Sequence, residues 1–102
     1  MALVNLESAL RKTINALKKA KEGTGFEILS YKRNRGISVI KEPGQRFWLR
    51  ERGYLDQEFE CSDKELQKHL KSMMKREFPR SRKVRMYFLE SKKHVGTQRK
   101  KL

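Results

Sequence analysis

The chain has 102 residues, of which 37% are charged and 36% hydrophobic, and its formal net charge is +14. This length suits one ordinary domain with one hydrophobic core. The single cysteine, Cys61, excludes an intrachain disulfide and a zinc site built on several cysteines, which fits a reducing, cytoplasmic environment. No stretch approaches the roughly 18 apolar residues of a membrane helix, so no membrane association is expected.

The positive charge is spread over the whole chain. Residues 91–102 contain five Lys and Arg and no acid, and this composition predicts a basic, disordered tail. Without them the chain still has 21 basic and 12 acidic residues, a net charge of +9. Residues 1–90 are therefore predicted to form a single basic domain. An excess of cations favours polyanionic partners, of which nucleic acid is the first candidate.

The N-terminal half predicts one helix and then four strands. Leucines and isoleucines recur every three or four residues at Leu3, Leu6, Leu10, Ile14 and Leu17, which is typical of an amphipathic helix. The glycines at 23 and 25 end this pattern. Short β-prone stretches follow at 26–31, 37–41, 46–52 and 54–61, and Pro43-Gly44 between the second and third suits a type II turn.

The C-terminal half predicts a second helix and a last strand. Ser62 is a suitable N-cap, with Glu65 placed to complete a capping box. Pro79 ends the helix, and a strand is expected over 83–90. The resulting order, α-β-β-β-β-α-β, predicts an α+β fold with a mostly antiparallel sheet of about five strands. Both helices are expected on one face, which leaves the other face exposed or free to bind a partner.

The stretch RFWLRER places arginines and the only tryptophan on one side of the third strand. Arg46, Trp48 and Arg50 share one parity there, and Arg85 and Tyr87 share one parity on the last strand. Exposed rings stack on bases, and guanidinium groups contact phosphates, so this face is a candidate nucleic-acid surface. The alternative is that Trp48 is a core residue and Arg50 pairs with an acid.

A lysine row marks the second helix. Lys64, Lys68, Lys71 and Lys75 are spaced by four, three and four residues, so they share one side of the helix. Like charges at these spacings repel, and a polyanion would remove the repulsion. The alternative is an ordinary solvated helix face.

Two basic loops are further candidates for phosphate contacts, which position a partner without reading its sequence. One contains Lys32, Arg33 and Arg35, and the other contains Arg80, Arg82 and Lys83. The alternative is that both are ordinary surface loops.

The acids and the cysteine do not suggest catalysis. Asp56, Glu58 and Glu60 share one parity, and pairing with arginines of the preceding strand explains them more simply than a divalent-metal nuclease site does. Cys61 shares its parity with apolar residues and is predicted to be buried. The sequence therefore predicts no catalytic residue, no metal site and no cofactor.

These features together predict a small, non-enzymatic nucleic-acid-binding protein. RNA is slightly favoured over DNA, because exposed aromatic rings suit unpaired bases. The alternative is a basic adaptor that docks on an acidic protein, with the same Trp and Arg side chains as its hot spot. The sequence does not determine an oligomeric state.

Overall fold

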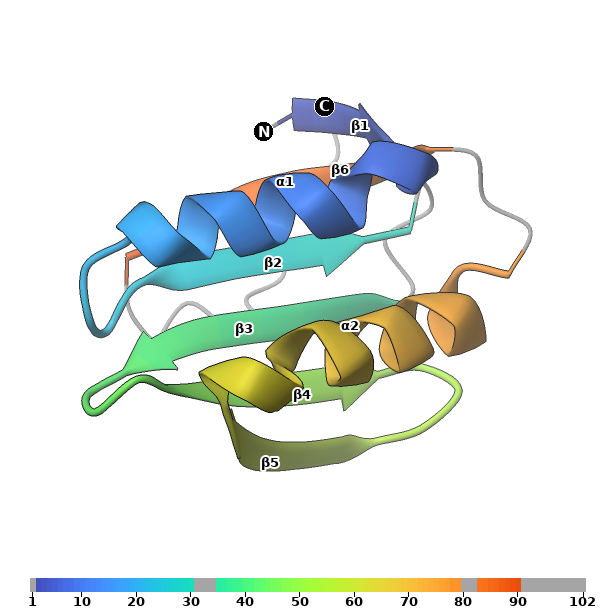
Figure 1. The fold of residues 1–102 in the computed structure, drawn as a ribbon. Helices are drawn as coiled ribbons and strands as arrows, with labels where there is room; N and C mark the ends of the chain where they lie inside the picture. The colour runs from blue at the N-terminus through green and yellow to red at the C-terminus, as the bar shows by residue number, and fades with distance from the viewer. Residues whose placement is uncertain (1, 31–34, 80–82, 91–102) are drawn as a thin grey trace.

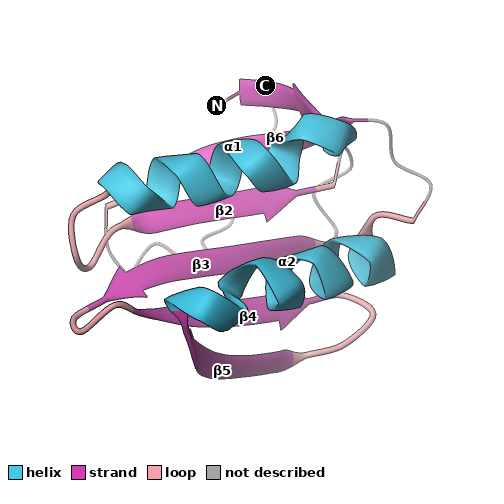
Figure 2. Cartoon of the chain, viewed as in Figure 1, coloured by secondary structure: helices cyan, strands magenta, loops and turns pink. Residues whose placement is uncertain are grey.

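The computed structural model describes residues 2–30, 35–79 and 83–90. In chain order the elements are β1 (Ala2–Asn5), α1 (Leu6–Lys19), β2 (Gly25–Leu29), β3 (Gly36–Glu42), β4 (Arg46–Arg52), β5 (Gln57–Ser62), α2 (Asp63–Glu77) and β6 (Lys83–Leu89). Every neighbouring pair of strands is antiparallel. Both helices lie on the same face of the sheet (Figure 2). The predicted α+β fold is therefore confirmed.

The strands form one sheet in the order β1-β6-β2-β3-β4-β5. Strands β2 to β5 make a meander, whereas β6 returns from α2 and inserts between β1 and β2. Helix α1 covers the half of the sheet that contains β6 and β2, and α2 covers the half that contains β3, β4 and β5 (Figure 1). No described helix lies on the opposite face of the sheet.

The start of the first predicted helix is wrong, because residues 2–5 form an additional strand. This strand, β1, pairs with β6 and places Leu3 opposite Arg85 and Val4 opposite Val84. Pairing with the edge of β6 satisfies backbone groups of this segment, so tertiary contact overrides the local helical periodicity. The helix begins only at Leu6.

The main core lies between the helices and the sheet. Apolar side chains of both helices meet inward residues of the central strands, as the periodicity predicted. Its most deeply buried members include Leu17, Ile28, Ile37, Leu49, Leu70, Met73, Phe78 and Val84. Burial of each such side chain is favourable by roughly 1.5–3 kcal/mol. The apolar sides of α1 and α2 therefore face the sheet, and their polar sides face solvent.

The junctions agree with the predicted turns in most respects. Gly44 has a φ of 78°, the sign that a type II turn requires at this position. Ser62 is the N-cap of α2, but its hydroxyl donates to Glu65 Oε1 at 3.2 Å instead of bonding a backbone amide. The strand predicted from Tyr54 begins at Gln57. The residues between β4 and β5 form a loop.

Candidate nucleic-acid interface

The outward side of α2 carries the four predicted lysines. The helix is amphipathic because Leu66, Leu70 and Met73 recur on one side, where all three are buried. The exposed residues of the opposite side include Lys64, Lys68, Lys71 and Lys75. At a rise of 1.5 Å per residue this row is about 16 Å long. The structure brings these four predicted residues together in one line.

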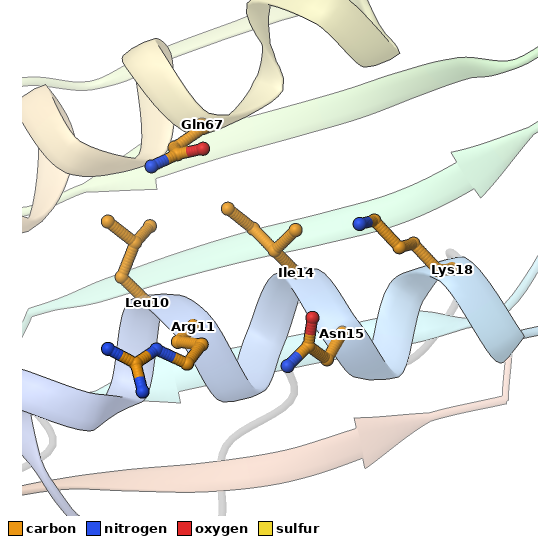
Figure 3. A pocket seen from close by; sticks show the side chains of 6 residues that line it. All are labelled: Leu10, Arg11, Ile14, Asn15, Lys18 and Gln67. Carbon is orange, nitrogen blue, oxygen red and sulfur yellow. The ribbon is translucent and has the colours of Figure 1, made fainter.

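Helix α1 adds cations beside this row. It runs antiparallel to α2 across the same face of the sheet (Figure 1). Leu10 and Ile14 point from α1 towards α2, where Gln67 faces them (Figure 3). Arg11 and Lys18 are exposed on the same part of α1. Sequence reasoning missed both cations, because only the packing of the helices shows that α1 lies next to the lysine row.

Two hollows lie along the seam between the helices. One, of about 320 Å³, is lined by Leu10, Arg11, Ile14, Asn15, Lys18 and Gln67. The other, of about 440 Å³, is lined by Leu6, Leu10, Lys71, Met74, Lys75, Phe78 and Pro79. Each combines apolar side chains with two cations. We call Arg11, Lys18, Lys64, Lys68, Lys71 and Lys75 together the helical cationic surface.

No ion pair joins this surface to a carboxylate among the side chains that the structure describes, which do not include that of Glu7. The side-chain ion pairs found there are Arg76–Glu51 and Arg46–Glu60, and neither involves the helical cationic surface. Like charges three or four residues apart destabilise a helix by about 0.2–0.5 kcal/mol per pair. A bound polyanion would offset this repulsion.

The opposite face of the sheet differs from the predicted stacking platform. The parity assigned to Trp48 is correct, since the alternate residues Phe47 and Leu49 lie in the main core. Its predicted exposure is wrong, because only 8% of Trp48 is accessible. The indole belongs to a second apolar cluster with Ile40 of β3, directly across from it, and with Leu89 of β6. The chain's only tryptophan is therefore a packing residue.

The arginines of this sheet face are interleaved with carboxylates. Arg46 and Glu60 form an ion pair at 3.4 Å, and about half of each side chain is exposed. Arg50 is exposed and lies opposite Glu58 in the register of β4 and β5. Asp56, Glu58 and Glu60 were predicted to pair with arginines of the preceding strand, and this prediction is confirmed for Glu60. The carboxylates of Glu58 and Glu60 therefore reduce the positive charge of the open sheet face around β4 and β5.

The remaining predicted residues of the sheet face lie on β6. Arg85 and Tyr87 are both half-buried. Tyr87 lies opposite Glu27 of β2, so a carboxylate is also close in the register there. These two residues are separated from Arg46 and Arg50 by β2 and β3.

The C-terminal ends of β2 and α2, after which the two predicted basic loops begin, lie at the same end of the sheet (Figure 1). Lys32, Arg33, Arg80 and Arg82 fall outside the described residues. Arg35 is half-buried, and its Nη1 donates to the backbone oxygen of Glu77 at 3.5 Å. Lys83 is exposed at the start of β6.

A buried polar network, which sequence reasoning missed, links α2 to the loop after β4. Glu51 is fully buried and accepts two hydrogen bonds from Arg76, at 2.6 and 2.7 Å, and one from Gln57 at 2.8 Å. Glu77 is also buried and accepts hydrogen bonds from the backbone amides of Tyr54 and Leu55, at 2.9 and 3.2 Å. The sequence contains one sign of this network: Glu51 is a carboxylate on the same side of β4 as the buried residues Phe47 and Leu49.

The two carboxyl groups of this network titrate in opposite directions. Burial alone would raise the pKa of Glu51, but hydrogen bonds from Arg76, Glu77 and Gln57 outweigh it and lower the pKa to about 2. Burial raises the pKa of Glu77, and its hydrogen bond with Glu51 adds to the rise. The network therefore favours the ionised form of Glu51, whereas burial and the neighbouring Glu51 disfavour the ionised form of Glu77. We interpret the network as structural, because both groups are shielded from solvent.

Other chemistry-bearing side chains show no catalytic arrangement among the described residues. Cys61 is buried as predicted, and burial, with a smaller contribution from Glu65, raises the pKa of its thiol. His69 packs edge-on against Phe59, with ring centroids 4.9 Å apart. Within the described ranges no three His, Cys, Asp or Glu side chains are grouped so as to hold a metal ion.

Comparison with protein-family models, with curated proteins and with solved structures finds no match for this chain. In the part that the structure describes, neither helix has the length and apolar character needed to cross a membrane.

Proposed function

We propose that this protein binds nucleic acid through the helical cationic surface, by contacts to phosphates and without catalysis. The observation that carries the proposal is the lysine row of α2, whose four side chains are exposed and form no ion pair with a carboxylate whose side chain the structure describes. Arg11 and Lys18 on the neighbouring helix extend the positively charged surface from α2 across to α1. A sugar-phosphate backbone suits such a surface, because each neutralised phosphate releases counterions.

The proposal keeps the lysine row of the sequence-based prediction and leaves out the open face of the sheet. The buried indole of Trp48 removes the main argument for unpaired bases on the open sheet face. It also removes that argument for RNA over DNA, so the proposal covers both. Phosphate contacts fix the register and orientation of a nucleic acid but carry no sequence information.

The test is a binding titration against single-stranded RNA, duplex RNA and duplex DNA over a range of salt concentrations. If all six cations contact phosphates, the logarithm of the association constant should fall with the logarithm of salt concentration with a slope of about −4 to −5. An affinity that stays constant between low and physiological salt would refute the proposal.

Two double variants test whether the helical cationic surface is the binding site. Lys68→Gln/Lys71→Gln removes two charges from the lysine row and should make the salt slope shallower by about 1.5. Lys12→Gln/Lys19→Gln removes two charges from exposed positions of α1 outside the helical cationic surface and should leave the slope unchanged. Equal effects of the two variants would mean that net charge alone drives binding, and would reject the assigned surface.

A further inference from the structure

The loop between β4 and β5 exposes large apolar side chains. Tyr54 is 69% exposed and Leu55 is 40% exposed, and the only other exposed large hydrophobic side chain among the described residues is Phe88. A tyrosine has an aromatic ring that can stack and a hydroxyl that water can solvate, so exposure alone does not indicate a binding site. What distinguishes Tyr54 is the way its backbone is held.

Buried groups hold this loop in one conformation. The carboxylate of Glu77 accepts the amides of both Tyr54 and Leu55, and only 2% of Glu77 is accessible. Gly53 has a φ of 144°, and a Cβ at this position would collide with Glu77 Oε1 and come within 2.8 Å of Arg35 Cγ. The Tyr54 ring is thus presented from a backbone that is fixed before any ligand binds, which lowers the entropy cost of binding.

Two arginines, Arg35 and Arg52, lie at the start of this loop. Arg35 packs against Gly53 and reaches the carbonyl oxygen of Glu77. Arg52, the last residue of β4, lies opposite Gly36 in the register and is half-buried. Because Glu77 also ends α2, the loop lies at the end of the lysine row that finishes with Lys75 (Figure 1). The loop that carries the exposed Tyr54 ring therefore starts next to two arginines, at the end of α2 where the lysine row finishes.

We propose that Tyr54 stacks on an unpaired base of a nucleic-acid strand whose phosphates contact the helical cationic surface. This inference rests on the proposed function and narrows its ligand to nucleic acid with single-stranded segments. A rigid aromatic ring beside cations is the combination that single strands require, since every base has a face for stacking and every linkage has a phosphate. A continuous duplex keeps its bases stacked on one another, so it offers no face to the ring.

The experiment compares a single-stranded oligonucleotide of about 12 nucleotides, with one adenine replaced by fluorescent 2-aminopurine, with the corresponding duplex. Tyr54→Ala should weaken single-strand binding by roughly 5- to 150-fold and leave duplex binding unchanged. Tyr54→Phe keeps a ring and should retain the wild-type affinity and the quenching of 2-aminopurine. Phe88→Ala is the matched control, because Phe88 is 57% exposed at the opposite end of the sheet.

The outcomes separate this inference from the proposed function. Unchanged single-strand affinity of Tyr54→Ala, with a wild-type protein that binds in a salt-dependent manner, would overturn the stacking role alone. Equal weakening of single-strand and duplex binding would also overturn it. Absence of salt-dependent binding by the wild-type protein to either probe would overturn the proposed function itself. Unfolding midpoints of the two Tyr54 variants, measured by urea titration, should match the wild type, since this ring is exposed. Phe88→Ala removes an edge-to-face contact with Phe26, at 5.8 Å between ring centroids, so its midpoint should fall slightly while the protein stays folded at the binding temperature.

Discussion

Replacement of Arg76 by methionine tests the buried network most directly. Arg76→Met keeps an unbranched side chain but leaves the Glu51 carboxylate buried without its cation. The two hydrogen bonds between them are 2.6 and 2.7 Å long, and the Glu51 side chain has no accessible surface, so water cannot replace the guanidinium without rearrangement. Breaking one partner of a buried ion pair costs about 3–5 kcal/mol.

The lowered pKa of Glu51 gives a second measure of how much the network stabilises the folded state. Its fall from 4.5 to about 2 on folding corresponds to about 3 kcal/mol of stability near neutral pH. Because the folded pKa is lowered, this contribution is present above pH 4.5 and is lost as the pH falls towards 2. The raised pKa of Glu77 acts in the opposite sense, since its contribution is present at low pH and is lost as the pH rises through its folded value. We therefore expect Arg76→Met to lower the free energy of unfolding by about 3 kcal/mol at pH 7, and by less at pH 3.

Urea denaturation followed by Trp48 fluorescence measures this change. The matched control is Arg46→Met, which also breaks an arginine–glutamate pair, but one whose side chains are 51% and 50% exposed. An exposed pair contributes roughly 0–1 kcal/mol, so this control should be nearly neutral. A cost below about 1 kcal/mol for Arg76→Met at pH 7, or a cost equal to that of Arg46→Met, would refute the reasoning.

Three further predictions concern single side chains. Trp48 should emit at short wavelength and resist quenching by acrylamide in the folded protein, because only 8% of the residue is accessible; a long-wavelength, readily quenched emission would contradict the second apolar cluster. Cys61 should react slowly with a thiol reagent at pH 8 and quickly in urea, because burial restricts access and raises the pKa of the thiol; equal rates would contradict this. Glu77→Ala should accelerate hydrogen exchange of the Tyr54 and Leu55 amides, which lose their acceptor, while exchange in β3 stays slow; unchanged rates at both amides would show that another group holds the loop.

Much of the fold could be predicted, because periodicity reports which side of an element is apolar. The stripes of α1 and α2, the alternation along β4 and the turn at Gly44 were all legible in the sequence. The exception was β1, whose residues 2–5 continue the helical pattern of α1 but pair with β6. Its state depends on a strand that lies some 80 residues further along the chain, and no local pattern reports such a partner.

The candidate site was only partly predictable. Spacing alone placed Lys64, Lys68, Lys71 and Lys75 on one side of a helix, since the helical repeat fixes that geometry. Parity alone placed Trp48 on the sheet face away from the helices, but it did not report the burial of that side chain. Burial depends on neighbours across the sheet, and Trp48 meets Ile40 and Leu89 there.

By itself the sequence determined the type of most elements, the sides of the helices that face the core, and the excess of cations over acids. Only the tertiary structure decided that Arg11 and Lys18 lie beside the lysine row, that Trp48 is buried, and that Glu77 fixes the loop carrying Tyr54. The physical reason is the range of the interactions. Periodicity and capping act within a few residues, whereas burial, ion pairing and surface charge arise where distant segments of the chain pack together.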